Sequence, residues 1–173
     1  VRMDYGGDGL YSSLGADAID GWHRWNTNWG RELYHEDGFL LLSSVPMAVG
    51  SFERDSYSLL TGRGFPLEKL APGDLANKYP RWNSDHYIDG YFNPRAGWAE
   101  AGEITASLAL DAQNSGVSIV TGFTVSGLLQ KGNKVVGAVS SDGTELRAEW
   151  VVVAAGVWTP ILLPELSDRM WPV

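Results

Sequence analysis

The sequence predicts a mixed α/β fold, and three observations support this prediction. A strand, helix, strand succession covers residues 87–120, and a βαβ crossover needs about 30 residues. Three short strand patterns separated by hairpin signals then occupy residues 123–150. Finally, residues 151–153 are consecutive valines, a pattern typical of a strand covered on both faces.

The first third is predicted to hold a long helix and a buried strand. Within residues 11–36, Trp22, Trp25 and Trp29 recur at helical spacing, which places them near one face of a helix. We interpret them as core or inter-domain packing; the alternative is a platform for a ligand. An Asp-Gly pair ends the helix, and residues 39–42 form an apolar run that suits a strand.

The middle third alternates short helices and strands. A short helix is predicted over residues 53–60, and residues 67–70, which lie between two prolines, are predicted to be a second helical piece. A strand over residues 87–92 leads into the clearest helix, over residues 98–113. A buried strand over residues 117–120 then completes the expected crossover.

The last third is predicted to be a three-stranded meander followed by a strand and a helix. Its strands cover residues 123–129, 134–140 and 145–150, separated by Gly-Asn and Asp-Gly turns. The valine strand at residues 151–153 comes next. Thr159, which precedes a proline, marks the start of the final helix as its N-cap.

Composition excludes several classes of function. The 173 residues contain no cysteine, which rules out a disulfide scaffold, an iron–sulfur cluster and a cysteine nucleophile. With 21 acidic and 13 basic side chains the net charge is −8, which argues against nucleic acid or an anionic membrane surface as a partner. The longest apolar stretch, residues 151–157, is far shorter than the ~20 residues of a membrane span.

Motifs for several common chemistries are missing from the sequence. It contains no Gly-x-Ser-x-Gly elbow, no Walker A loop and no Gly-x-Gly-x-x-Gly fingerprint; residues 62–64 come nearest, with Leu67 where a third glycine belongs. His35, Glu36 and Asp37 are adjacent, but neighbouring helical residues do not converge on one ion. We interpret them as a solvated helix end. The sequence therefore predicts no metal site and assigns no catalytic residue.

One local feature suits a cofactor. The valine strand runs into Ala154, Ala155 and Gly156, which leave the backbone free of bulky side chains, so that a flat or phosphorylated cofactor can approach it. Trp158 is then placed to form a wall of the pocket. The alternative is that these small residues only permit a tight turn from strand to helix.

Five segments in order carry a resemblance to a known family. They are residues 1–5, 36–41, 90–98, 117–121 and 151–158. Taken together, they resemble the FAD-dependent amine oxidases of the D-amino-acid-oxidase superfamily, and within it the branch of sarcosine oxidase, fructosyl-amino-acid oxidase (amadoriase) and saccharopine oxidase. The resemblance is collinear over nearly the whole chain.

The resemblance implies FAD as the cofactor and a particular domain organisation. It implies an internal fragment that lacks the N-terminal glycine fingerprint and a C-terminal part, the latter beginning near residues 171–173. The fold implied is a partial FAD-binding, Rossmann-like domain with the meander and part of a substrate-binding domain. Residues 1–35 and 99–173 are assigned to the FAD-binding lobe and residues 36–98 to the substrate domain, so that residues 1–173 form one incomplete two-lobed unit.

The resemblance also implies roles for individual residues. Arg2 matches an arginine that helps to hold the substrate carboxylate, a task that suits the planar guanidinium fork; from the residues alone, the alternative is a surface partner for Asp4. Where relatives have Ala-Thr-Gly or Ser-x-Gly, this chain has Ala-Ala-Gly, which removes a hydroxyl contact with FAD and keeps the backbone one. The positions implied to contact FAD are Val125, Ala155, Gly156 and Trp158.

The function implied is oxidation of secondary amines or N-substituted amino acids, of sarcosine, fructosyl amino acid or saccharopine type, to imines with reduction of oxygen to hydrogen peroxide. Two alternatives remain, a dehydrogenase with another acceptor and a non-catalytic binding module. The isolated chain is expected to be inactive and to bind FAD weakly or not at all. A small amino-acid-derived amine is the expected partner. Self-association through surfaces exposed by truncation and an intracellular location, cytoplasmic or peroxisomal, are also expected.

Overall fold

The computed structural model describes residues 1–83 and 85–170. The chain divides into two compact units, unit 1 (Val1–Ser115) and unit 2 (Gly116–Val173), which we describe separately. Helices and several antiparallel sheets confirm the mixed α/β class. The assignment of segments to an FAD-binding lobe and a substrate domain stays a prediction. The expected start of a further family segment near residues 171–173 lies outside the described residues.

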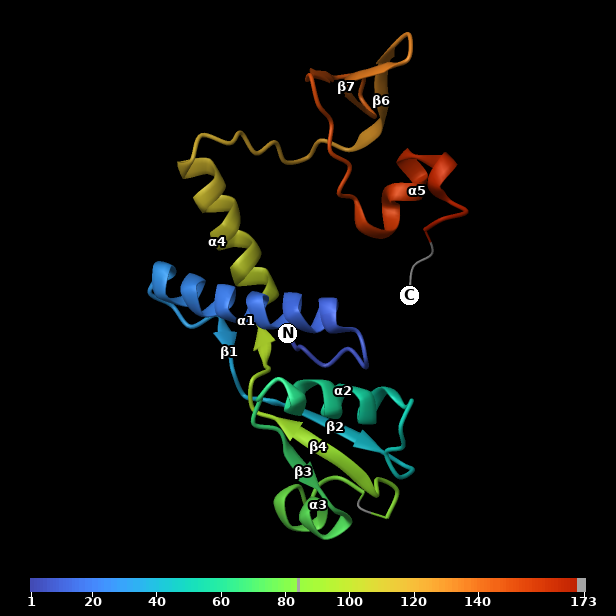
Figure 1. Ribbon diagram of the computed structural model, residues 1–173. Helices are drawn as coiled ribbons and strands as arrows, with labels where there is room; N and C mark the ends of the chain where they lie inside the picture. Colours follow the sequence, from blue (N-terminus) through green and yellow to red (C-terminus); the bar gives the residue numbers. More distant parts are fainter. Residues whose placement is uncertain (84, 171–173) are drawn as a thin grey trace. The chain divides into compact units, whose positions relative to one another are not determined.

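Unit 1 is built around a three-stranded antiparallel sheet in the order β2-β4-β3 (Figure 1). Strand β4 pairs with β2 from Phe39 opposite Asn93, and α2 packs against β2. Strands β1 and β5 form a separate two-stranded sheet. In chain order the elements are α1 (Gly9–Trp29), β1 (Tyr34–His35), β2 (Phe39–Ser43), α2 (Phe52–Gly62), β3 (Glu68–Leu70), α3 (Pro72–Lys78), β4 (Asp89–Asn93), β5 (Trp98–Ala99) and α4 (Ala101–Asn114).

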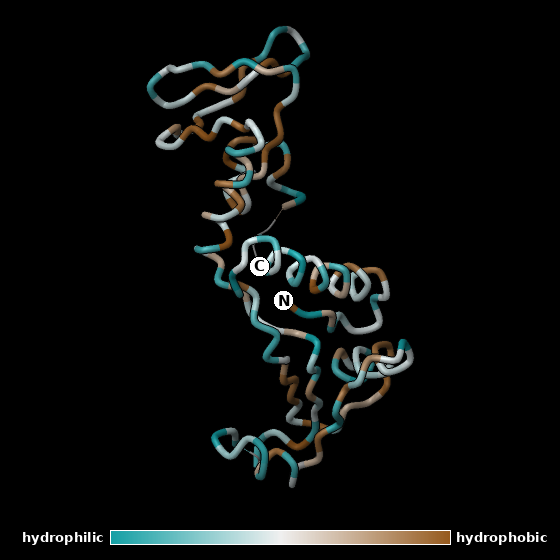
Figure 2. The backbone as a smooth tube through the Cα atoms, turned by 90° about the vertical axis from the view of Figure 1, so that its left-hand side faces the viewer, coloured by the Kyte–Doolittle hydropathy of each residue, from teal (hydrophilic) through white to brown (hydrophobic). Residues whose placement is uncertain are grey.

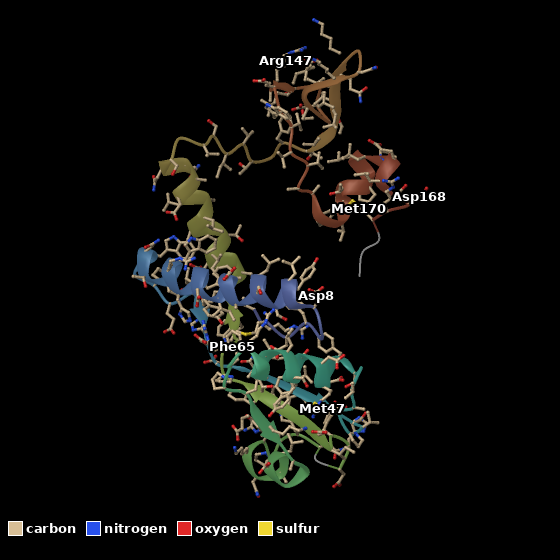
Figure 3. All side chains as sticks on the ribbon, in the orientation of Figure 1. Asp8, Met47, Phe65, Arg147, Asp168 and Met170 are labelled. Atoms are coloured by element: carbon tan, nitrogen blue, oxygen red, sulfur yellow. The ribbon has the colours of Figure 1, made fainter. Side chains whose placement is uncertain are left out.

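Helix α1 is shorter than predicted because it ends at Trp29, and capping residues define both of its ends. Asp8, at its N-terminal end (Figure 3), accepts hydrogen bonds from the backbone N–H groups of Leu10 and Tyr11, each 3.0 Å long. Gly30 ends the helix in the left-handed conformation, with φ 61°. Hydrophilic and hydrophobic residues are mixed along α1 (Figure 2), and among the described helices none is long and apolar enough to cross a bilayer.

The main core of unit 1 lies where α1 meets the segments around it. Met3, Ile19, Tyr34 and Leu60 are all at most 1 % exposed and contact one another. The tryptophans of α1 only partly match the prediction: Trp22 packs against this core, whereas Trp25 is 38 % exposed and Trp29 donates through Nε1 to Asp111 of α4 at 2.7 Å. Two of the three buried residues of α1, Ser12 and Gly15, are small and let the helix approach its neighbours closely; the third is Ile19 of the core.

Two predictions from the sequence are wrong. Residues 67–70, which lie outside the expected crossover, were predicted to be helical, yet Glu68–Leu70 is strand β3, because it finds a hydrogen-bonding edge on β4. The expected βαβ crossover lacks its second strand, because residues 117–120 do not form one; Val117 is 54 % exposed and Val120 58 %. Strand formation needs a paired neighbour as well as apolar side chains, and the described residues provide none there.

Unit 2 contains the predicted meander. Strands β6 (Val125–Lys131), β7 (Lys134–Ser140) and β8 (Glu145–Arg147) pair antiparallel in chain order. The valine segment at residues 151–153 is not a strand in the structure, and Val152 is 88 % exposed. The final helix starts as predicted, except that Trp158 rather than Thr159 is the N-cap. The closing elements are η1 (Gly156–Trp158), α5 (Thr159–Leu162) and η2 (Pro164–Leu166).

The buried hydroxyl of Tyr34 predicts sensitivity to alkaline pH. Burial, with a smaller contribution from Glu36, raises the pKa of Tyr34 to about 12 from its ordinary 10.0. A raised pKa means that the stability from the neutral hydroxyl is complete below pH 10 and is lost as the pH rises toward 12. In Tyr34→Phe, we expect the thermal midpoint to fall less between pH 10 and 12 than in the unchanged chain. Equal losses in a circular-dichroism melt would contradict this.

Candidate functional site

Arg2 lies in the segment that precedes α1, and its backbone is fixed from two directions. On one side the N–H of Gly97 donates to the carbonyl of Val1 at 2.9 Å. On the other side α1 presents Gly15, where an added Cβ would lie only 2.6 Å from the carbonyl oxygen of Arg2. Glycine is therefore required at this position for the helix to pack on the segment.

A buried carboxylate anchors the same segment to the central sheet. Asp4 is fully buried and accepts hydrogen bonds from the hydroxyl of Tyr91 at 2.7 Å and from Nδ2 of Asn93 at 3.0 Å. Burial first, and then the bond to Asp4, raise the pKa of Tyr91, so that its hydroxyl stays a proton donor. The surface ion pair between Arg2 and Asp4, the alternative to carboxylate binding, is not formed: Asp4 is bound by β4 instead.

The guanidinium of Arg2 is surrounded by aromatic rings. Its central carbon lies 5.7 Å from the ring centre of Tyr5, 5.1 Å from that of Phe39 and 5.8 Å from that of Phe52. Within the described part of the chain, no carboxylate lies at ion-pair distance from Arg2, and its side chain makes no hydrogen bond. A half-buried positive charge with free N–H donors is suited to binding an anionic group of a ligand.

Sequence reasoning missed the three rings and the buried carboxylate group. Tyr5, Phe39 and Phe52 come from different elements, and no local spacing connects them. The only signal was indirect: an arginine and an aspartate in an otherwise apolar stretch before a helix require partners from elsewhere in the fold.

A second charged cluster binds α1 to the turn between β4 and β5. Arg95 donates to Asp20 at 2.7 Å and lies 3.5 Å from Glu36, which also contacts His23. The hydrogen bond from Arg95 lowers the pKa of Asp20, and the same bond raises that of Arg95. We interpret this cluster as structural, since its charges pair with one another and join two elements.

His35, Glu36 and Asp37 do not form a helix end, because α1 stops earlier, and they do not converge on an ion. His35 instead contacts Glu100 at 2.9 Å, and its ring stacks on Trp98 with centres 4.2 Å apart. Nε1 of Trp98 donates to Asp37 at 2.8 Å. Among the described residues no group of three potential metal ligands is present.

Unit 2 contains the predicted cofactor positions. Val125 and Ala155 line one cavity of about 320 Å³, so the structure brings these two residues together. The other walls come from Leu128, Ala138, Leu162 and residues 151–154. These side chains are all apolar, and the alanines leave the backbone accessible.

Gly156 and Trp158 lie next to this cavity, at the turn into α5. Gly156 has φ 55°, a left-handed conformation that favours glycine, and no atom would contact a Cβ placed there. Trp158 is 66 % exposed, and its backbone N–H donates to the backbone carbonyl of Ala155 at 3.0 Å. An apolar cavity beside a backbone with little side-chain cover fits a flat cofactor. Arg2 belongs to unit 1, apart in sequence from these positions.

Comparison with known proteins identifies the family. Residues 2–173 match the family model described as FAD dependent oxidoreductase, DAO, and the chain belongs to this family. Its members use FAD, so the cofactor expected from the sequence is confirmed at the level of the family. The resemblance implies that Val125, Ala155, Gly156 and Trp158 would hold it, and this assignment stays a prediction.

Curated relatives share part of the chain. A bifunctional ThiO/ThiG protein of Nostoc sp. (strain PCC 7120 / SAG 25.82 / UTEX 2576) is 33% identical over 98 residues, which are 57% of this chain and 14% of the relative. A D-amino acid dehydrogenase of Xylella fastidiosa (strain M23) is 34% identical over 114 residues, 65% of this chain and 26% of the relative. The chain thus spans a small part of these relatives.

Solved structures share the fold. L-proline dehydrogenase from P. horikoshii has a TM-score of 0.80 at 20% identity, covering 95% of this chain and 43% of that one. NikD, described as an unusual amino acid oxidase, has a TM-score of 0.77 at 23% identity, covering 96% and 42%. A modified fructosyl peptide oxidase from Aspergillus nidulans has a TM-score of 0.73 at 22% identity, covering 91% and 38%. These structures support the mixed α/β fold of the family.

Proposed function

We propose that the whole protein oxidises the C–N bond of an N-substituted amino acid, of sarcosine, fructosyl amino acid or saccharopine type, and passes the electrons to oxygen. The observation that carries this proposal is the guanidinium of Arg2, which lies among aromatic rings with no carboxylate of the described chain beside it. Such a group is suited to hold the carboxylate that distinguishes an amino acid from a simple amine.

In this reaction the chain's own residues bind and orient the substrate. The planar fork of Arg2 donates two parallel N–H bonds to the carboxylate, which restricts the rotation of the substrate. Asp4 keeps the Arg2 segment on β4, and the rings keep water from one side of the guanidinium. FAD, when bound, supplies the acceptor for a hydride from the carbon beside the nitrogen. The substrate nitrogen also loses a proton, and water hydrolyses the resulting imine.

Some relatives support amino-acid or amine substrates in general, because their names describe an unusual amino acid oxidase and a fructosyl peptide oxidase. Others favour a second candidate, a dehydrogenase that passes electrons to an acceptor other than oxygen. Two of the similar proteins are named as dehydrogenases, one for L-proline and one for D-amino acids.

An assay of the whole protein loaded with FAD tests both candidates. Sarcosine, N-fructosyl glycine and saccharopine are each supplied in air, with detection of hydrogen peroxide, and under argon with an artificial electron-accepting dye. We expect one of these amines to yield one peroxide per amine consumed. Dye reduction without peroxide would favour the dehydrogenase, and consumption of none of them would contradict the proposed function.

A further inference from the structure

The three rings around Arg2 come from three separate elements. Tyr5 belongs to the segment before α1, Phe39 begins β2, and Phe52 is the first residue of α2. Arg2 and Phe39 are half-buried, and Tyr5 and Phe52 are 36 % and 45 % exposed. The guanidinium therefore lies where these elements meet, against apolar surface and at the edge of solvent.

Aromatic rings hold a guanidinium differently from a carboxylate. A carboxylate would accept the N–H bonds of Arg2 and neutralise its charge, which would leave little to offer an anionic ligand. A ring attracts the cation through its π face and accepts no strong hydrogen bond from the N–H groups. Contact with rings alone thus restrains the guanidinium and leaves both its charge and its donors available.

Phe52 is itself held in a defined position. Ser51 caps α2, its Oγ accepting from the N–H of Arg54 at 3.3 Å, which fixes the start of the helix that carries the ring. The ring lies against Gly6, where an added Cβ would be 3.3 Å from Cδ2 of Phe52. The N–H of Gly6 is in turn bonded to Oγ of buried Ser56, one turn further along α2, at 2.7 Å. The ring and the Arg2 segment are therefore fixed by the same helix.

We propose that Phe52, with Tyr5 and Phe39, is a positioning residue for Arg2: the rings hold the guanidinium in the orientation that binds the substrate carboxylate. This inference rests on the proposed function and adds the residues that set affinity for the carboxylate end of the substrate. Loss of the Phe52 ring weakens binding of the carboxylate and leaves the chemical step unchanged, because Phe52 acts only through Arg2.

The kinetic test compares Phe52→Leu with Phe52→Tyr in the whole protein loaded with FAD, using the best substrate among sarcosine, N-fructosyl glycine and saccharopine. We expect Phe52→Leu to raise KM about tenfold, the size of a partly desolvated cation–π contact, with kcat within about twofold. Phe52→Tyr keeps a ring, and its KM is expected to stay within about twofold of that of the unchanged protein. Trp82→Leu, at an exposed aromatic residue elsewhere in unit 1, is the matched control.

A second measurement reports on Arg2 without any turnover. In the NMR spectrum of the whole protein, the Nε–H proton of Arg2, assigned by its loss in Arg2→Lys, is expected to be shifted upfield by the rings. Phe52→Leu should reduce this shift and Phe52→Tyr should retain it. A shift that does not respond to Phe52→Leu overturns the proposal, as does an unchanged KM in that variant.

The Arg2→Met variant separates a failure of the proposed function from a failure of the positioning role. If Arg2→Met leaves KM unchanged, the carboxylate role in the proposed function has failed and this inference fails with it, even where the NMR shift responds to Phe52. If Arg2→Met raises KM and Phe52→Leu does not, only the positioning role of the rings is overturned.

Discussion

Arg2→Met is expected to raise the KM of the whole protein for its N-substituted amino acid about 100-fold, since a bidentate, charge-assisted pair contributes about 3 kcal/mol. Methionine suits the test because its flexible thioether can fill the space among Tyr5, Phe39 and Phe52 and contact their rings. The variant therefore removes the charge and the N–H donors while it keeps most of the packing. Steady-state kinetics with the best amine substrate measure the change.

Arg24→Met is the control for this substitution. Arg24 is an exposed arginine on α1, so its loss removes the same charge from the same unit without affecting the ring-lined site. We expect its KM to stay within about twofold of the unchanged protein. Equal rises in KM for Arg2→Met and Arg24→Met would mean that net charge, and not a specific carboxylate site, determines affinity.

Gly15→Ala is expected to destabilise unit 1 by about 2 kcal/mol or more, although alanine is the better helix former. The new methyl group would lie 2.6 Å from the carbonyl oxygen of Arg2 and 2.9 Å from Cα of Met3, both backbone atoms that cannot rotate away. Helix α1 must then move off the segment that carries Arg2. Urea unfolding followed by the far-ultraviolet circular dichroism of the chain measures the loss.

Gly21→Ala on the same helix is expected to have the opposite effect. A Cβ at Gly21 would meet only the flexible end of Arg24, at 3.7 Å, so the substitution should stabilise the chain by about 0.5–1 kcal/mol through helix propensity alone. Similar midpoints for Gly15→Ala and Gly21→Ala would contradict the close packing of α1 on the Arg2 segment.

Elements whose signals are local were predicted well from the sequence. The meander strand Lys134–Ser140 has the predicted bounds, because the Gly-Asn turn before it and the Asp-Gly turn after it determine where it begins and ends. Helix α2 was likewise predicted to within a residue or two. In contrast, residues 117–120 and 151–153 have apolar patterns typical of strands but no hydrogen-bonded partner among the described residues, and a pattern of side chains cannot show whether a partner exists.

The site was predicted unevenly for a similar reason. Arg2, Val125 and Ala155 were identified through their resemblance to a family motif, and the structure places Val125 and Ala155 on one cavity. The roles of these residues stay predictions. The rings around Arg2 and the bonds from Tyr91 and Asn93 to Asp4 join residues up to 89 positions apart, and such contacts become visible only in the folded chain.

The central claim is that Arg2 binds the substrate carboxylate in an FAD-dependent amine oxidoreductase. Its most direct test is anaerobic titration of the whole protein with its N-substituted amino acid and, separately, with the same amine lacking the carboxylate, following the visible absorption of the flavin. We expect the amino acid to reach half of its maximal rate of flavin bleaching at a concentration about 100-fold lower than its analogue. Bleaching by both at the same concentration, or by neither, would contradict the claim.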